Sequence, residues 1–485
     1  MKRLSSAPAL LTLIICCSFF LHYRIFNLDI LGPHTWRQTY TQSNIDCFYE
    51  EDNNILHPRL LARGETDGIS PKEFPLFQWT TAQVYRIFHQ SISVTRHFCF
   101  LISALGILAF YLLVTVLTKN KMLGVAGASM FMFSPLFYYY SVNPLPDIFA
   151  LSTAVWSMYL FYRHAESDSL KHSVLASLLL CAAAMTKLPY ILFAGIPAGM
   201  LFNMIRTKED GSKIMKYALH LVFFIPVIWW YAQSLQEMRD NPVLGGFLSD
   251  YENESSVGEI IVGQLVSMLP ELYLNYAAVP FFLAGLIFAF RKRSSLLNIH
   301  LPLTLTALLL FAYFGYEITL IGLIHDYYML PFLPLLFLIA VAGIQYLLTQ
   351  NRQWISYPIV ILLLIAPATA RLRTDSRWSV DKSTFNKDWY IYRKEIQNAA
   401  PDSVRVVIGN DETQSILPYY AHKRCWTYVD SELSAERLEK MISQGAKYLF
   451  TDSQYTLNDL ALQPYLTNKK AQFGSVHIYE LQSAR

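Results

Sequence analysis

The chain alternates long apolar runs with short polar connections, and each run has about the length of a membrane-spanning helix. A hydrocarbon core about 30 Å thick needs roughly 20 mostly apolar residues per helix. The pattern therefore predicts an all-α polytopic membrane protein with about eleven transmembrane helices, whose boundaries can shift by several residues. The predicted spans are 6–23, 97–118, 122–140, 147–162, 172–186, 188–205, 217–232, 273–290, 298–320, 327–348 and 354–370.

The distribution of lysine and arginine between these runs predicts the orientation of the chain. Short cytoplasmic connections carry an excess of basic residues. With the N-terminus in the cytoplasm and the C-terminus outside, the short outer connections hold little beyond Lys187 and Arg239. The cytoplasmic segments then collect Lys2, Arg3, Lys119, Lys121, Arg163, Lys171, Arg206, Lys208, Lys213, Lys216, Arg291, Lys292, Arg293 and Arg352.

Three stretches are too polar to cross a membrane, and all three fall on the outer side of this topology. Residues 24–96 form a first outer loop far longer than a connection needs, which is typical of a functional loop. Within residues 233–272, apolar residues from Val257 to Leu269 repeat at helical spacing, which predicts a helix that lies flat in the membrane interface.

The third polar stretch, residues 371–485, predicts a small α/β domain. Runs rich in β-forming residues cover 404–408, 448–451 and 475–481, and an amphipathic helix covers 434–443. Such alternating elements pack in layers around a common core. We therefore expect a transmembrane domain over 1–370, which includes the outer loop 24–96, and an extracytoplasmic α/β domain over 371–485.

Composition and charge exclude several classes of protein. The 485 residues are 53% hydrophobic and only 15% charged, so the charges are too few for a soluble surface of this size. The net charge of +3 provides no basic field, and we expect no nucleic-acid partner. The six cysteines show neither metal-ligand spacing nor a disulfide framework.

Two charged residues at the outer ends of predicted spans are candidates for chemistry, because ionisable groups there are costly. Asp147 follows Pro146 at the start of the fourth span, where a carboxylate either caps the helix or serves as a base or metal ligand. Lys187 lies in the tight turn between two spans. Its ammonium either reaches up to the lipid headgroups or binds a phosphate.

Three further segments combine aromatic rings with strong hydrogen-bonding groups. His325 and Tyr328 lie at the outer end of the tenth span, where tyrosine is also common as an interfacial residue. Arg37, in the segment that runs from His34 to Gln38, can bind a phosphate with two parallel hydrogen bonds. Glu73 lies between Pro71 and Pro75, which favours a positioned carboxylate, although a solvated loop acid is the commoner case for glutamate.

Together these motifs resemble those of the GT-C membrane glycosyltransferases, in particular the family 39 group of protein O-mannosyltransferases and the lipid A aminoarabinose transferase. The matching features span roughly residues 30–335, and the forms around Arg37 and Glu73 are most similar to the bacterial branch, whose acceptor is unknown. They are Trp36-Arg37-Gln38, Glu73-Phe74-Pro75-Leu76, Ser134-Pro135, Asp147, Thr186-Lys187 and His325-Asp326-Tyr327-Tyr328-Met329-Leu330-Pro331.

The resemblance implies a GT-C enzyme that moves a sugar, with inversion, from a polyprenyl-phosphate donor to a lipid, glycan or protein acceptor at the outer face of the plasma (inner) membrane. Its partners would be that donor, the acceptor and membrane lipids. The donor phosphate and sugar would be held by Arg37, Lys187, His325, Tyr328, Trp36 and Gln38.

Three acidic residues are candidates for the base that takes the proton of the acceptor. Relatives carry an acidic residue early in the first loop, but this chain has none between Asp29 and Asp46. The candidates are Glu73, Asp147 and Asp46, in that order of preference. No dedicated metal cage is visible, so the metal ligands are unknown and a divalent metal remains an open alternative.

Two other classes of function are considered as alternatives. A secondary transporter or flippase places ionisable groups or broken helices near the midplane of both halves. Here the interiors of the spans at 97–118, 122–140, 188–205 and 354–370 carry no charged residue. A surface-polysaccharide polymerase or ligase has its main loop late in the chain, whereas the largest loop between spans here is the first.

Overall fold

The computed structural model describes residues 6–240, 256–291, 301–350 and 353–483, and the chain divides into two compact units. The membrane unit contains the chain up to Phe26, residues 72–76 and residues 96–375. The sheet unit contains residues 27–71, 77–95 and 376–485. The predictions that concern Lys2, Arg3, Lys292, Arg293, Arg352 and residues 241–255 lie outside the described residues.

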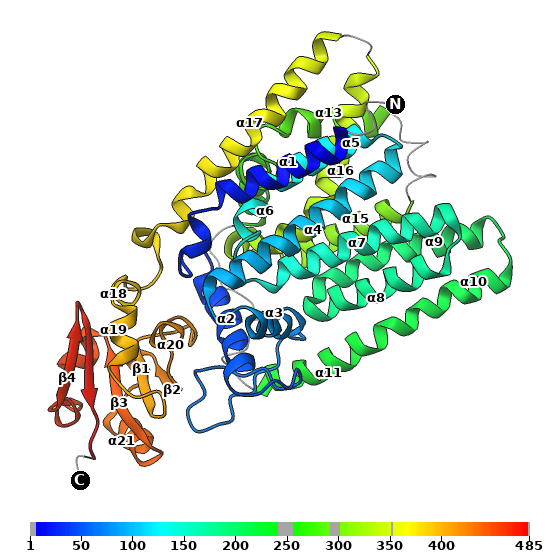
Figure 1. Ribbon diagram of the computed structural model, residues 1–485. Coiled ribbons are helices and arrows are strands. Elements are labelled where there is room, and N and C mark those ends of the chain that lie inside the picture. Colours follow the sequence, from blue (N-terminus) through cyan, green and yellow to red (C-terminus); the bar gives the residue numbers. More distant parts are fainter. Residues whose placement is uncertain (1–5, 241–255, 292–300, 351–352, 484–485) are drawn as a thin grey trace. The chain divides into compact units, whose positions relative to one another are not determined.

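The membrane unit is helical, and within the described residues a helix lies at each predicted span (Figure 1). The α-helices of this unit are α1 (Ser6–Leu21), α4 (Ile92–Thr118), α5 (Lys121–Met132), α6 (Pro135–Tyr140), α7 (Pro146–Ser167), α8 (Leu170–Thr186), α9 (Gly195–Arg206), α10 (Gly211–Ala218), α11 (Ile225–Asp240), α12 (Val257–Gly263), α13 (Val279–Arg291), α15 (Leu301–Tyr316), α16 (Leu333–Leu348) and α17 (Ser356–Thr374). Tighter or wider turns connect several of them, namely η3 (Leu188–Ala194), η4 (Leu219–Phe224), η6 (Gln264–Tyr273), η7 (Leu320–Ile324) and η8 (Asp326–Phe332).

Several predicted spans are shorter or less regular than the apolar pattern suggested. Among the described residues, five helical stretches are long and apolar enough to cross a membrane: Ile92–Thr118, Leu188–Arg206, Gly211–Ser234, Asp326–Leu348 and Ser356–Trp378. The span predicted at 122–140 is wrong as a single helix, because Ser134 caps a new helix that begins at Pro135. The number of crossings therefore stays a prediction, whereas the multi-pass helical architecture is observed.

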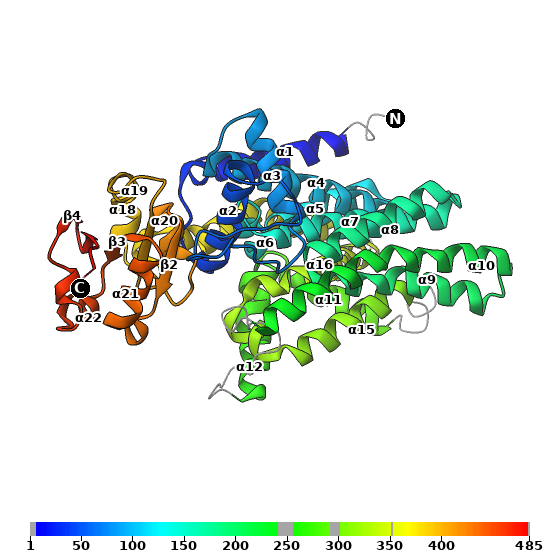
Figure 2. The same cartoon turned by 90° about the horizontal axis from the view of Figure 1, so that it is seen from below.

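Some helices of the membrane unit pack against their neighbours in the chain, and others pack against helices that are distant in the sequence. The consecutive helices α7 and α8 pack against each other, as do α13 and α16, and α9 packs on both α10 and α15 (Figure 2). Small residues permit the closest of these contacts. A Cβ atom on Gly343 of α16 would lie 1.9 Å from the carbonyl oxygen of Phe281 on α13. Small residues at such positions let helix backbones approach in a membrane.

This contact predicts that Gly343→Ala destabilises the membrane unit. The added methyl group has no space beside a backbone carbonyl, so the free energy of unfolding should fall by about 1–3 kcal/mol. Gly315→Ala is the matched control, since nothing lies within 4 Å of the position that its Cβ atom would take. Thermal unfolding of the purified proteins in detergent measures both, and an equal midpoint for the two variants would contradict the packing argument.

The sheet unit contains a five-stranded sheet with the order β2-β1-β3-β5-β4. The three strands β2, β1 and β3 are parallel, while β5 is antiparallel to both β3 and β4. The strands are β1 (Arg405–Gly409), β2 (Cys425–Tyr428), β3 (Ala446–Thr451), β4 (Lys469–Phe473) and β5 (Val476–Glu480). Helices of this unit are α2 (Thr35–Glu50), α3 (Leu76–Ile87), α18 (Asp388–Ile391), α19 (Arg393–Asn398), α20 (Ile416–Ala421), α21 (Ala435–Ser443) and α22 (Gln454–Asn458).

Both faces of the sheet carry an apolar core. Val406 and Ile408 of β1 face the core that includes residues of α19 and α20, whereas Val407 of the same strand faces the core that includes α21. This is the alternation expected for a strand buried on both sides. Three of the strands and α21 match the elements predicted from the sequence.

Part of the long first loop, residues 24–96, joins this sheet, which the sequence pattern did not indicate. The amide of Cys425 donates to the carbonyl of Leu61 over 3.0 Å, and the carbonyl of Cys425 accepts from the amides of Arg63 and Gly64 at 3.0 and 2.8 Å. The loop therefore pairs with the outer edge of β2. In addition, Asp29 forms an ion pair with Arg393.

Candidate functional site

A buried ion pair lies at one end of the membrane unit. Asp147 occupies the first turn of α7, and Lys187 follows the last residue of α8. Their Oδ2 and Nζ atoms are 3.7 Å apart, with side-chain exposures of 1% and 11%. Because α7 and α8 pack along each other, the start of one lies beside the end of the other. The structure therefore favours a specific site for Lys187 over an ammonium that reaches for the headgroups.

Asp147 is not the N-cap residue of α7, which was one of the two interpretations of its position. Leu145 is the N-cap residue, and Asp147 lies inside the first turn, where a negative charge still interacts favourably with the helix dipole. The hydroxyl of Tyr190, which is fully buried, donates to the backbone carbonyl of Asp147 over 3.1 Å. The carboxylate of Asp147 pairs with Lys187.

Aromatic rings surround the ammonium of Lys187. Its Nζ atom lies 4.8 Å from the ring centre of Tyr328 and 5.4 Å from that of Tyr327, which is the range of cation–π attraction. The ring of His325 stacks on Tyr327 at 5.1 Å and meets Tyr328 edge-on at 5.3 Å. The tight turns of η8 directly after His325 bring these consecutive side chains together.

Glu73 lies in a short segment of the first loop that belongs to the membrane unit. The amide of Phe74 donates to the carbonyl of Met185, two residues before Lys187, over 3.1 Å. Glu73 is 8% exposed, so it is not the solvated loop acid that is common for glutamate. The membrane unit therefore brings Asp147, Lys187, Tyr328 and His325 together, and it ties the backbone beside Glu73 to the end of α8.

The other predicted donor-binding residues lie on α2 in the sheet unit. Arg37 is buried, and its guanidinium lies 5.2 Å from the ring centre of Tyr40. Gln38 donates from its side-chain amide to the carbonyl of Pro33 over 3.0 Å. Trp36 packs against the apolar core on one face of the sheet. These residues are thus built into the fold of the sheet unit rather than exposed on a solvated loop.

Asp46 also lies on α2, where polar side chains enclose it. Its carboxylate accepts hydrogen bonds from the side-chain amides of Gln42 at 2.9 Å and Gln90 at 3.2 Å. Burial raises the pKa of Asp46 to about 6, because a charged carboxylate is poorly solvated there, and the nearby His422 opposes this shift. His422 forms an ion pair with Glu50 that raises its own pKa.

The raised pKa predicts how Asp46 affects stability. Its pKa is higher in the folded than in the unfolded chain, so the folded form is favoured at low pH, and this contribution is lost as the pH rises from about 4 to about 6. Hydrogen exchange of the α2 amides should therefore be slower at pH 4.5 than at pH 7, after correction for the intrinsic rate.

Asp46→Asn should remove most of this pH dependence, because the amide does not ionise. Asp67→Asn, in an exposed turn of the same loop, is the matched control and should retain it. An unchanged pH dependence in Asp46→Asn would contradict the assignment.

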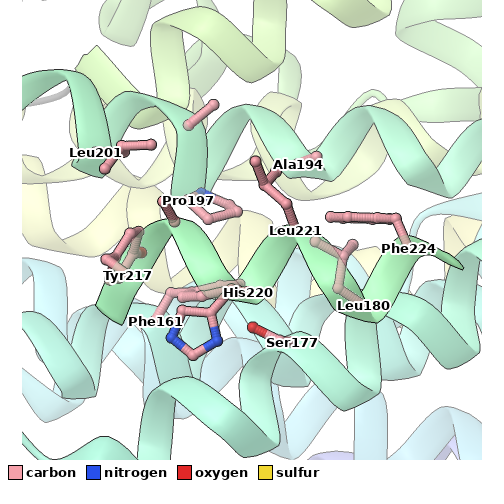
Figure 3. A pocket seen from close by; sticks show the side chains of 12 residues that line it. Phe161, Ser177, Leu180, Ala194, Pro197, Leu201, Tyr217, His220, Leu221 and Phe224 are labelled. Atoms are coloured by element: carbon pink, nitrogen blue, oxygen red, sulfur yellow. The ribbon is translucent and has the colours of Figure 1, made fainter. Parts of the chain in front are cut away.

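An apolar cavity lies elsewhere in the membrane unit. A cavity of about 120 Å³ is lined by Phe161, Ser177, Leu180, Tyr217, His220 and Phe224, among others (Figure 3). Phe161 comes 14 residues after Asp147 on α7, which corresponds to about 21 Å along the helix. None of the predicted site residues lines this cavity, so we assign it no part in the site.

Within the parts of the chain that the structure describes, no group of three or more His, Cys, Asp or Glu side chains could hold a metal ion.

Tyr140 is a residue beside the aromatic rings that the sequence pattern did not indicate. Its hydroxyl donates to Asp326 over 2.6 Å. Its position in a run of three tyrosines carried no signal beyond an interfacial belt.

One family model and several solved structures are similar to this chain. Residues 71–230 match the family described as dolichyl-phosphate-mannose-protein mannosyltransferase. No curated protein is significantly similar in sequence. The apo crystal structure of ArnT from Cupriavidus metallidurans superposes with a TM-score of 0.64 at 12% identity, covering 99% of this chain and 98% of that one.

Two further structures share the fold. ArnT from Cupriavidus metallidurans bound to undecaprenyl phosphate gives a TM-score of 0.61 at 12% identity, with 98% of both chains covered. The arabinofuranosyltransferase AftD from Mycobacteria gives 0.58 at 13% identity, with 99% of this chain and 40% of that chain covered. These likenesses confirm the predicted fold class and support the predicted glycosyltransferase activity: the chain has the GT-C fold of membrane glycosyltransferases.

Proposed function

We propose that the protein transfers a sugar from a polyprenyl-phosphate donor to an acceptor at the outer face of the plasma membrane, with inversion at the anomeric carbon. The observation that carries this proposal is the buried ion pair of Lys187 and Asp147 beside two tyrosine rings, with the backbone next to Glu73 hydrogen-bonded to the end of α8. The proposal includes the orientation of the chain: the N-terminus is cytoplasmic and the sheet unit is extracytoplasmic. The acceptor is a lipid, a glycan or a protein.

Lys187 is the group that we expect to bind the donor phosphate. ArnT, which shares the fold over nearly its whole length, has been solved with undecaprenyl phosphate bound. An ammonium held between a carboxylate and two rings can turn toward a phosphate without a large cost in side-chain entropy, because it is already ordered. His325 and Tyr328 add hydrogen-bonding groups for phosphate or sugar oxygens. Arg37, Trp36 and Gln38 are proposed as further contacts to the donor.

The reaction needs a carboxylate that takes the proton of the acceptor hydroxyl. The acceptor oxygen then forms a bond to the anomeric carbon while the bond from that carbon to the phosphate oxygen breaks. The electron pair leaves with the polyprenyl phosphate, and Lys187 stabilises the charge that develops there. Glu73 is the first candidate for the base, because it is buried and the backbone on both sides of it is fixed by hydrogen bonds. Asp147 is the second candidate for the base and Asp46 is the third.

The assignment of Glu73 as the base predicts that Glu73→Gln lowers the transfer rate by about 10²–10⁴-fold, because the amide cannot accept the proton. Asp147→Asn should also lower it, since it removes the partner of Lys187. Transfer is measured by mass spectrometry as consumption of undecaprenyl-phosphate-linked hexoses and pentoses in membranes that carry the protein.

Glu166→Gln is the matched control, because Glu166 lies at the opposite end of α7 and pairs with Arg163 over 2.7 Å. It should retain activity. Full activity of both Glu73→Gln and Asp147→Asn would remove these acids from the mechanism.

The role of Lys187 predicts that Lys187→Gln weakens the affinity for undecaprenyl phosphate by about 10–100-fold, which is the value of a charge-assisted hydrogen bond. Lys187→Arg retains the charge and should retain part of the affinity. Lys171→Gln, an exposed lysine at the other end of α8, is the control. Binding is measured by native mass spectrometry, with thermal unfolding as the check on folding. An unchanged affinity in Lys187→Gln would restore the interpretation of Lys187 as a headgroup anchor.

A further inference from the structure

We infer that Trp230 and Ser234 of α11 are positioning residues that hold Glu73 in register with Lys187. The inference rests on the proposed function, because it gives these residues a role only if Glu73 acts in the transfer. Neither residue stands out in the sequence. Their role follows from the contacts that the segment of residues 72–76 makes with two different helices of the membrane unit.

The peptide group before Glu73 is fixed from α11. The carbonyl oxygen of Lys72 accepts a hydrogen bond from the indole nitrogen of Trp230 over 3.2 Å and another from the hydroxyl of Ser234 over 2.9 Å. Residues 230 and 234 are one helical turn apart, so both donors point from the same face of α11. Both side chains are buried. Two donors to one carbonyl restrict the direction of the backbone that carries Glu73.

The peptide group after Glu73 is fixed from the end of α8. The amide of Phe74 donates to the carbonyl of Met185 over 3.1 Å, and the hydroxyl of Tyr231 donates to the same carbonyl over 3.0 Å. The ring of Phe74 meets Trp230 edge-on at 5.0 Å. The peptide group before Glu73 is thus tied to α11, and the one after it is tied to the end of α8, two residues before Lys187.

This arrangement is more specific than packing requires. The surroundings are an apolar core formed by residues that include Cys181, Val227, Trp230 and Tyr231, and a Phe or Ala side chain would fill the same space without polar atoms. Buried donors aimed at one carbonyl instead define an angle and a distance. A displacement of about 1 Å at a reacting group can cost about 10²-fold in rate. The contacts therefore act on the placement of the Glu73 carboxylate.

The test is the double variant Trp230→Phe/Ser234→Ala, which removes both donors and keeps most of the packing. We expect its transfer rate to fall at least tenfold, while its affinity for undecaprenyl phosphate stays within about twofold of the parent. Ser234→Thr retains a hydroxyl and, with Trp230 unchanged, should keep most of the rate. Trp229→Phe is the control, because the neighbouring Trp229 is 48% exposed. A double variant with the parental rate would overturn the inference.

A second measurement separates positioning from a general loss of structure. The variant Glu73→Asp has a shorter side chain that carries the same carboxylate. In this background, removal of the two donors should lower the rate less than it does in the parent, because both changes act on the same group. Equal losses in the two backgrounds would overturn the inference in favour of a structural role. Full activity of Glu73→Gln would instead overturn the proposed role of Glu73 itself, which distinguishes the two failures.

Discussion

The chemistry that we propose for the membrane unit depends on keeping an ammonium and a carboxylate together in a place with little water. Lys187 and Asp147 are 3.7 Å apart, and both side chains are nearly inaccessible to solvent. Charges in such surroundings are tolerated only when they are paired, and loss of one partner leaves the other uncompensated. The packing of α7 along α8 supplies the pairing, and the rings of Tyr327 and Tyr328 enclose the ammonium.

The backbone close to this ion pair accepts several hydrogen bonds from side chains. Tyr190 binds the carbonyl of Asp147, Phe74 and Tyr231 bind the carbonyl of Met185, and two donors of α11 bind that of Lys72. Irregular backbone at the end of a membrane helix leaves polar groups that need partners when they are buried within protein. Satisfying them with side chains of other helices also fixes the positions of the charged groups. Stability of the helix ends and order in the site thus have a common origin.

In the sheet unit, backbone groups at the edge of the sheet also find partners in a distant segment of the chain. A strand at the edge of a sheet exposes unpaired backbone groups. Residues 61–64 of the first outer loop pair with β2 at Cys425, while Asp29 pairs with Arg393. The loop that carries Trp36, Arg37 and Gln38 is therefore ordered by the C-terminal part of the chain. An outer loop tied to a folded sheet can hold polar side chains in fixed positions, which a free loop cannot.

The sequence alone determined the helical membrane architecture, because the length of an apolar run is set by the thickness of the bilayer. It also predicted β1, β3 and β5, whose apolar side chains identify them. It missed β2, which has four residues, and β4, whose lysines are typical of an edge strand. The helix α2 was missed too, since its buried face carries Thr, Gln and Asn rather than a periodic apolar stripe.

For the site, single residues could be nominated from their type and position, because Asp147, Lys187 and His325 are polar groups at the ends of apolar runs and Glu73 is a carboxylate between two prolines. Only the tertiary structure decided which of them meet. The pairing of Lys187 with Asp147 and the anchoring of Glu73 by Trp230 and Ser234 join segments up to 162 positions apart. No local pattern records such contacts, because they arise from the packing of helices whose order in the chain does not fix their neighbours in space.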